Sequence, residues 1–190
     1  MTEEPTDAAL LRGTAAGDEA AFDRFVERHR AAVFRYARSR GSDADAEEVL
    51  QQTFVSAWRN AGKVTIAGSA RPWLFTVARN AMVRLHRPRR SGVVELPLED
   101  LGAAAGFAAA TATPERFAAA TEERELLEQA LLALPDTDRE VLHLRDLEQL
   151  PGDDVAALLG LTLTAMKSRL HRARLRLVAE VRRLLPEENR

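Results

Sequence analysis

A run of basic residues without acidic neighbours, between Lys167 and Arg176, is the strongest chemical signal in this chain. Besides its two end residues, the run contains Arg169, Arg172 and Arg174. Because no acidic residue lies among them, salt bridges within one helix do not explain their presence. Lysine and arginine bind phosphate oxygens, and arginine also donates hydrogen bonds to guanine in the major groove. The pattern indicates contact with DNA, and an ordinary solvated helix surface is the alternative.

The residues around this run predict a helix-turn-helix that would present it. Apolar residues at 155–159 suit a short helix, and Gly160 follows where that helix must end, since glycine accepts a positive φ. Thr162 is a suitable N-cap for a second helix, whose apolar residues recur at steps of three and four. Three polar residues share its basic face: Thr164, Ser168 and His171. Two helices, a tight turn and an exposed basic face together describe a DNA-binding helix-turn-helix.

Charge is also segregated elsewhere, although 27 basic and 29 acidic residues nearly cancel overall. Residues 79–90 contain five arginines and no acid, whereas residues 42–48 contain four acids and no base. Trp58 and Trp73 flank a loop that carries Lys63, and bases of single-stranded DNA stack on aromatic rings beside basic residues. Core packing is the alternative for both tryptophans, and it is the favoured one for Trp58. Patches of opposite sign predict at least two kinds of partner.

Helical periodicity and capping signals predict an all-α protein of two small helical domains. The first domain is expected at 8–87, with its helices starting near residues 8, 19, 43 and 70. Residues 88–113 are rich in alanine, glycine, proline and threonine and predict a flexible linker. The second domain is expected at 114–185, where helices opening at Pro114 and Pro135 lead into the helix-turn-helix. No segment alternates like a strand, so we expect no sheet.

Composition excludes several classes of function. The 190 residues include no cysteine, so disulfides and thiolate metal sites are excluded. The first residues are acidic, and no run approaches about 18 apolar residues, so we expect a cytoplasmic protein. The histidines lack metal-ligand spacing, and neither a Gly-rich phosphate loop nor a nucleophile motif occurs. We therefore expect no enzyme activity, no metal and no cofactor.

Four strings spread over both halves resemble the extracytoplasmic-function sigma factors, the small two-domain branch of the bacterial sigma-70 family. They are GDEAAFDRFVERHRAAVFRYA (17–37), DAEEVLQQTFVSAW (45–58), RPWLFTVARNAM (71–82) and LPDTDREVLHLRDLE with VAALLGLTLTAMKSRLHRAR (134–174). The resemblance implies a promoter-specificity subunit, with sigma region 2 in the first domain and sigma region 4 in the second. It also implies three partners, namely core RNA polymerase, promoter DNA and an anti-sigma factor.

By position, the resemblance implies three contact surfaces. Binding of the polymerase clamp helices is implied for Asp45, Glu47, Glu48, Gln51, Gln52 and Phe54. Compensation of a helix dipole is the alternative for the acidic residues among them. Binding of the −10 element as a single strand is implied for Trp58, Lys63, Arg71, Trp73, Thr76, Arg79, Asn80 and Arg84, with one base flipped into the 61–70 loop. Docking on the polymerase flap and reading of the −35 element are implied for the second domain, through Thr162, Thr164, Lys167, Ser168, Arg169, His171, Arg172 and Arg174.

Three local departures from the family pattern bear on these DNA contacts. The run NAMVRLHRPRR (80–90) lacks the usual aspartate, residues 151–154 (PGDD) replace a Ser-Tyr-Glu-Glu type start, and Ala165 stands where threonine is common. We therefore expect an altered edge of the −10 site and a shifted −35 preference. A slack linker also lets the free chain fold its halves together and hide DNA-binding surfaces.

A stand-alone helix-turn-helix repressor or activator is the second hypothesis. Such a protein would bind a duplex operator tightly without polymerase, as a dimer. It would give the acidic residues at 42–48 and the aromatic helix around Trp73 no role.

Overall fold

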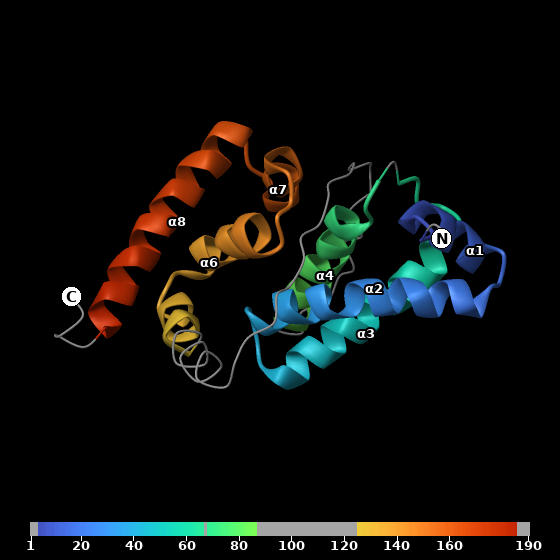
Figure 1. Ribbon diagram of the computed structural model, residues 1–190, viewed down its shortest axis with the longest axis horizontal. Helices are drawn as coiled ribbons and strands as arrows, with labels where there is room; N and C mark the ends of the chain where they lie inside the picture. The colour runs from blue at the N-terminus through green and yellow to red at the C-terminus, as the bar shows by residue number, and fades with distance from the viewer. Residues whose placement is uncertain (1–3, 67, 87–124, 186–190) are drawn as a thin grey trace.

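The computed structural model of the chain describes residues 4–66, 68–86 and 125–185. The predicted linker at 88–113 and the start of the helix after Pro114 lie outside the described residues. Every regular element within the described ranges is helical, which confirms the prediction of an all-α fold (Figure 1). None of the described helices is both long enough and apolar enough to cross a membrane.

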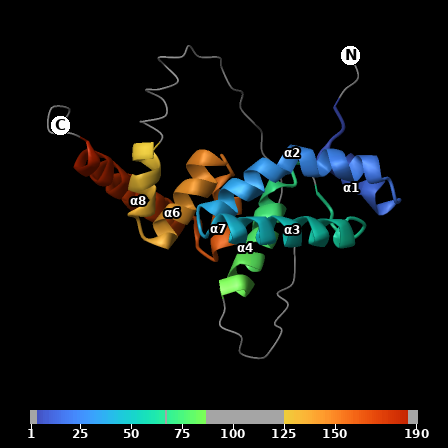
Figure 2. The ribbon, with the colours of Figure 1, turned by 90° about the horizontal axis from the view of Figure 1, so that it is seen from below.

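Four helices form the first half of the chain: α1 (Asp7–Ala15), α2 (Glu19–Arg38), α3 (Asp43–Asn60) and α4 (Arg71–His86). Asp18 caps α2, and Ser42 caps α3 through a capping box with Asp45, as short polar side chains do at the starts of helices. α2 and α3 lie side by side and α4 crosses them, as the two ribbon views agree (Figure 2). α4 contacts both of these helices, and half of its residues are buried.

The second half contains a helix at residues 125–132 and then α6 (Asp136–Leu142), α7 (Gly152–Leu159) and α8 (Leu163–Leu184). Between α6 and α7 lies a π-helical turn, η1 (His143–Leu147), which the sequence did not predict. Gly160 ends α7 with φ at 66°, and the Thr162 hydroxyl accepts a hydrogen bond from the Ala165 N–H at 3.2 Å. The predicted helix-turn-helix is therefore confirmed, with its glycine and its cap in the expected places.

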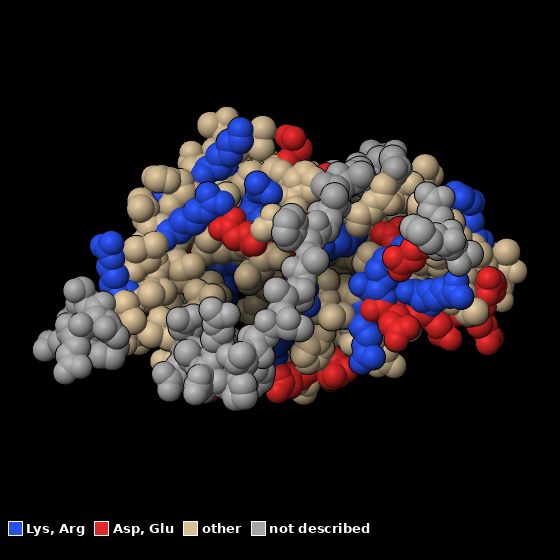
Figure 3. Space-filling model, in the orientation of Figure 1, with Lys and Arg blue, Asp and Glu red and all other residues tan. Residues whose placement is uncertain are grey.

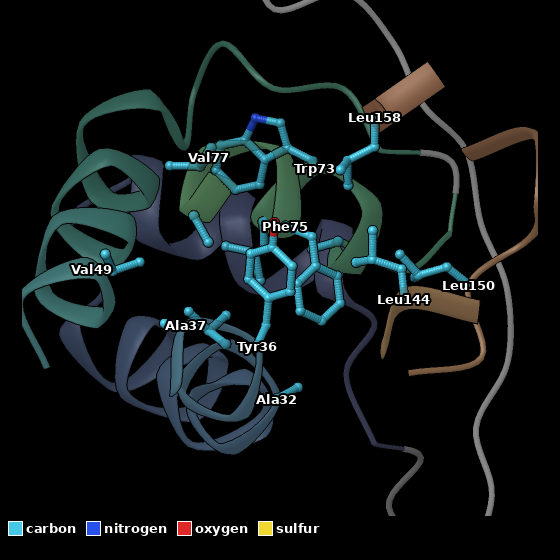
Figure 4. Close-up of a cluster of buried hydrophobic side chains, with 14 of the residues drawn as sticks. Ala32, Tyr36, Ala37, Val49, Trp73, Phe75, Val77, Leu144, Leu150 and Leu158 are labelled. Carbon is cyan, nitrogen blue, oxygen red and sulfur yellow. The ribbon is translucent and has the colours of Figure 1, made fainter. Parts of the chain in front are cut away.

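The two halves share one hydrophobic core. Leu144 and Leu150 of the second half lie in the same cluster of side chains as Phe75 and Tyr36 of the first half (Figure 4). α4 also contacts α7, and Leu158 of α7 lies close to α4 in the same view. This arrangement agrees with the expectation that the free chain can fold its halves together. Its consequence for DNA binding depends on which residues the contact covers.

Candidate nucleic-acid interface

One face of α8 presents the polar and basic residues that the sequence assigned to the −35 element. Met166, Leu170 and Ala173 are buried against the rest of the second half. The opposite side chains are exposed, apart from the half-buried Arg169, and comprise Thr162, Thr164, Lys167, Ser168, His171, Arg172 and Arg174. Basic side chains accordingly gather over α8 on the surface of the molecule (Figure 3). The helix offers an exposed basic face of the kind that enters a major groove.

Arg174 differs from the other basic residues of this face. Its guanidinium donates to both carboxylate oxygens of Asp146 in η1, at 2.9 and 2.6 Å. The hydrogen bond to Asp146 raises the pKa of Arg174, whereas Lys167, Arg169 and Arg172 form no ion pair with any residue that the structure describes. Exposed ion pairs contribute only about 0–1 kcal/mol, so a DNA phosphate can replace Asp146.

The two tryptophans differ in burial, and Trp58 does not follow the interpretation that the sequence favoured for it. Trp58 was expected on the inner side of α3, but its side chain is 41% exposed and meets Phe22 edge to face, with ring centroids 4.9 Å apart. Trp73, which the sequence offered either to core packing or to a base, is only 6% exposed and lies in the shared core (Figure 4). The core-packing interpretation of Trp58 was therefore wrong, whereas the assignment of both tryptophans to the −10 element stays a prediction. The difference in burial arises because α4 packs between other helices, whereas the end of α3 lies at the edge of the bundle.

The remaining residues assigned to the −10 element fall into three groups. Lys63 and Arg84 are exposed, and Asn80 is half-buried on the same helix as Arg84. The Thr76 hydroxyl donates a hydrogen bond to the Pro72 carbonyl oxygen at 3.0 Å, so its donor already has an acceptor within α4. Arg71 and Arg79 are held by carboxylates of the second half, a contact that no sequence pattern indicated.

Two buried carboxylates, Glu140 of α6 and Glu148 after η1, bind arginines of the first half. Glu148 pairs with Arg71 and with Arg35, whose Nε lies 3.1 Å from its Oε1. Glu140 accepts hydrogen bonds from Arg79 Nε at 3.1 Å and from the Tyr36 hydroxyl at 2.7 Å. Arg40 Nη1 lies 3.0 Å from the other oxygen of Glu140. We call these six charged residues the carboxylate–arginine contact: Glu140, Glu148, Arg35, Arg40, Arg71 and Arg79.

Neighbouring groups keep Glu148 ionised although it is buried. Burial alone would raise the pKa of Glu148, but a hydrogen bond from His143 and the charges of Arg35 and Arg71 outweigh it, so the pKa is lowered from its ordinary 4.5. Burial and the nearby Glu140 raise the pKa of Tyr36 well above 10, so its hydroxyl stays a donor. Glu140 and Glu148 have 4% and 1% of their surface exposed, which excludes water that would weaken the attraction.

The residues assigned to polymerase binding do not all reach the surface. Glu47, Glu48 and Gln51 are exposed on one side of α3, and Gln52 donates to Glu48 at 2.9 Å. Asp45 takes part in the capping box, where the Ser42 N–H and hydroxyl lower its pKa. Phe54 is 7% exposed and packs against Phe25, so it supports this surface from the core and does not form part of it.

The described residues contain no cluster of three or more histidine, cysteine, aspartate or glutamate side chains that could hold a metal ion.

Comparison with known proteins relates both halves to one family. Residues 25–91 match sigma-70 region 2, and residues 124–177 match sigma-70 region 4. The chain is 34% identical over 183 residues to the RNA polymerase sigma factor CnrH of Cupriavidus metallidurans, covering 94% of this chain and 96% of that protein. It is also 34% identical over 177 residues to the ECF RNA polymerase sigma factor SigM of Mycobacterium tuberculosis, covering 92% and 84%.

A solved structure agrees with these relatives. The structure of CnrH in complex with the cytosolic domain of CnrY covers 94% of this chain and 99% of its own, with a TM-score of 0.67 and 29% identity. The likeness therefore extends over both halves. With the helix-turn-helix, the four-helix first half and these matches taken together, the chain belongs to the sigma-70 family, in its extracytoplasmic-function branch.

Proposed function

We propose that this chain is the promoter-specificity subunit of a bacterial RNA polymerase, a DNA-binding initiation factor without chemistry of its own. In this role it binds core polymerase, recognises the −35 and −10 elements and helps to open the DNA. The observation that carries the proposal is the exposed basic face of α8, held behind a glycine turn and the Thr162 cap. Because such a subunit acts on the chromosome, we expect it in the cytoplasm.

Each half of the chain would have its own role in this function. Residues 8–87 would act as region 2, residues 88–113 as linker and residues 114–185 as region 4. The exposed residues Glu47, Glu48 and Gln51 of α3 offer an acidic face to a basic surface of core polymerase. A protein inhibitor, the anti-sigma factor that the family resemblance implied, is a further partner. The relative CnrH has been solved with the cytosolic domain of CnrY, which supports a second protein partner here.

The closed arrangement would be the inactive form of the subunit. Arg71 and Arg79, both assigned to the −10 element, are occupied by carboxylates of the other half. Trp73 is buried in the shared core as well. Promoter binding therefore requires the halves to separate, and binding to core polymerase can supply the free energy, because a ligand shifts an equilibrium toward the state that it binds better.

Run-off transcription with core polymerase on a promoter-fragment library, read by sequencing, tests this function. The wild-type chain should direct initiation at a defined pair of elements, and a Lys167→Ala, Arg172→Ala double variant should lose −35-dependent initiation. If both side chains contact phosphates, the slope of log affinity against log salt should fall by about two. Arg182→Ala, an exposed basic residue farther along α8, is the matched control and should change neither.

The alternative of a stand-alone repressor or activator is tested with the same chain. Tight binding of a duplex site without polymerase, combined with no association with core polymerase, would refute the sigma function. A sigma subunit should instead bind duplex DNA weakly by itself and specifically with polymerase.

A further inference from the structure

Two arginines of the carboxylate–arginine contact have no role from sequence or family position. Arg35 lies in the last turn of α2, and Arg40 lies just beyond that helix. Their partners, Glu148 and Glu140, both belong to the second half. Arg71 and Arg79 of α4 share the same two carboxylates. The first half thus supplies four cations, and the second half supplies the anions.

Separation of the halves would leave these four arginines without counter-charges. None of them forms an ion pair with an acidic residue of the first half among the residues that the structure describes. Arg35 and Arg71 share Glu148, and Arg40 and Arg79 share Glu140, so the open form would keep two pairs of positive charges on its surface. A surface with charge of one sign attracts anions, here to the positions that the two carboxylates vacate.

Aromatic rings of the first half hold two of the guanidinium groups in place. The Arg40 guanidinium lies 5.9 Å from the centroid of the Tyr36 ring, and that of Arg71 lies 5.9 Å from the centroid of Phe75. Both rings come from α2 and α4, so this cation–π support stays when the second half leaves. Arginine binds carboxylate and phosphate with the same planar fork of donors. A surface that holds two buried carboxylates is therefore already arranged for phosphates.

We infer that Arg35 and Arg40, together with Arg71 and Arg79, form a binding surface for backbone phosphates of promoter DNA, which Glu140 and Glu148 occupy in the free chain. The inference rests on the proposed function. DNA is favoured over an acidic peptide because α4 continues to the half-buried Asn80 and to Arg84, which is exposed in the closed form. A DNA strand that follows α4 would reach the four arginines once the halves have separated.

The test uses full-length chain bound to core polymerase and a fluorescent promoter fragment with a duplex −35 element and a single-stranded −10 element. The Arg35→Gln, Arg40→Gln double variant should bind this fragment at least several-fold more weakly. Its slope of log affinity against log salt should be smaller by about one for each phosphate that is no longer bound. Arg30→Gln, an exposed arginine of α2 with no ion pair among the described residues, is the matched control and should behave as wild type.

Binding of the variants to core polymerase, followed in parallel by fluorescence anisotropy of labelled chain, separates the inference from the proposed function. Wild-type initiation together with an unchanged affinity and salt slope in the double variant would overturn the inference and leave the sigma function standing. Weaker binding of a synthetic acidic peptide by the double variant, with DNA binding intact, would overturn it as well. Failure of the wild-type chain to join core polymerase would instead overturn the proposed function and this inference with it.

Discussion

At the scale of single residues, Asp7 links three elements of the first half. Its side chain is buried, and it accepts hydrogen bonds from Arg28 of α2 at 2.8 Å and from the Ala70 N–H at 2.6 Å. The His29 Nε2 lies 3.0 Å from the same carboxylate oxygen that accepts from Ala70. Because Ala70 directly precedes α4, this carboxylate of α1 fixes the end of the loop that was expected to receive a flipped base. Asp7 therefore positions the proposed −10 surface without belonging to it.

Replacing Asp7 by asparagine should lower the free energy of unfolding by about 3 kcal/mol, because the buried His29 and the half-buried Arg28 would lose the negative charge that they contact. Urea unfolding followed by circular dichroism measures this change. Glu4→Gln is the matched control, since Glu4 also pairs with Arg28, at 3.0 Å, but is 86% exposed. That control should change stability by less than about 0.5 kcal/mol. Equal effects of the two substitutions would contradict the positioning role.

The same carboxylate should make stability depend on pH. Burial alone would raise the pKa of Asp7, but the His29 imidazole, the Ala70 N–H and Arg28 outweigh it and hold the pKa far below its ordinary 3.8. The folded state therefore binds this proton less readily than the unfolded chain. The contribution of Asp7 is complete above about pH 3.8 and is lost as the pH falls toward the folded-state value. The asparagine variant should lose less stability than wild type over that acid range.

At the scale of elements, the turn between α7 and α8 fixes the direction of the DNA-binding face. Gly160 has the left-handed conformation that side chains disfavour, and nothing lies within 4 Å of the position where a Cβ would stand. Strain of the backbone, and not crowding, therefore explains the glycine. Thr162 then opens α8 by accepting from the Ala165 N–H. The chain turns sharply here, and the basic side of α8 points to solvent as a result.

Thr162→Ala should destabilise the second half by about 1 kcal/mol, because the first turn of α8 loses its side-chain cap. Hydrogen exchange of the α8 amides is the appropriate measurement, since it reports on this half separately. Thr164→Ala provides the comparison: the residue is exposed within the first turn of α8 and has no capping role. Equal protection in the two variants would show that the cap does not hold the helix.

At the scale of the whole molecule, closure depends on charge as well as on apolar packing. Glu148 has a fully buried side chain between Arg71, Arg35 and His143. Its neutral glutamine isostere would leave the two arginines without a counter-charge inside the contact, which costs more than the ion pair contributes by itself. Ionic contacts supplement the apolar packing between the halves. Because salt and competing anions weaken these ionic contacts, the halves can also separate.

Glu148→Gln should shift the free chain toward the open form. The chain has no cysteine of its own, so single cysteines at Arg24 and Arg182, both exposed, can carry a donor and an acceptor fluorophore. Energy transfer should fall in the Glu148→Gln variant, and in wild type when core polymerase is added. Glu125→Gln, an exposed acid of the second half, is the matched control. If energy transfer is the same in the Glu148→Gln variant as in wild type, apolar packing alone keeps the halves together.

Local physics allowed the sequence by itself to determine the helices and the DNA-binding motif of this protein. Helix caps and the glycine turn depend on residues only a few positions apart, so the sequence alone predicts them. Examples are the caps at Asp18, Ser42 and Thr162 and the positive φ at Gly160. The π-helical turn at His143–Leu147 escaped prediction because Leu147 continues the apolar pattern of α6 although it is 53% exposed. Periodicity cannot separate such a turn from a regular helix.

Only the tertiary structure decided which charged residues meet. Glu148 and Arg35 are 113 residues apart, and Glu140 and Arg79 are 61 apart, so no local pattern relates them. No local pattern marks Glu140 or Glu148 as buried, and burial of a carboxylate is tolerable only when partners arrive from elsewhere in the chain. The burial of Trp73 and the exposure of Trp58 have the same origin. Packing between distant segments determines burial and pairing, whereas neighbouring residues determine caps and turns.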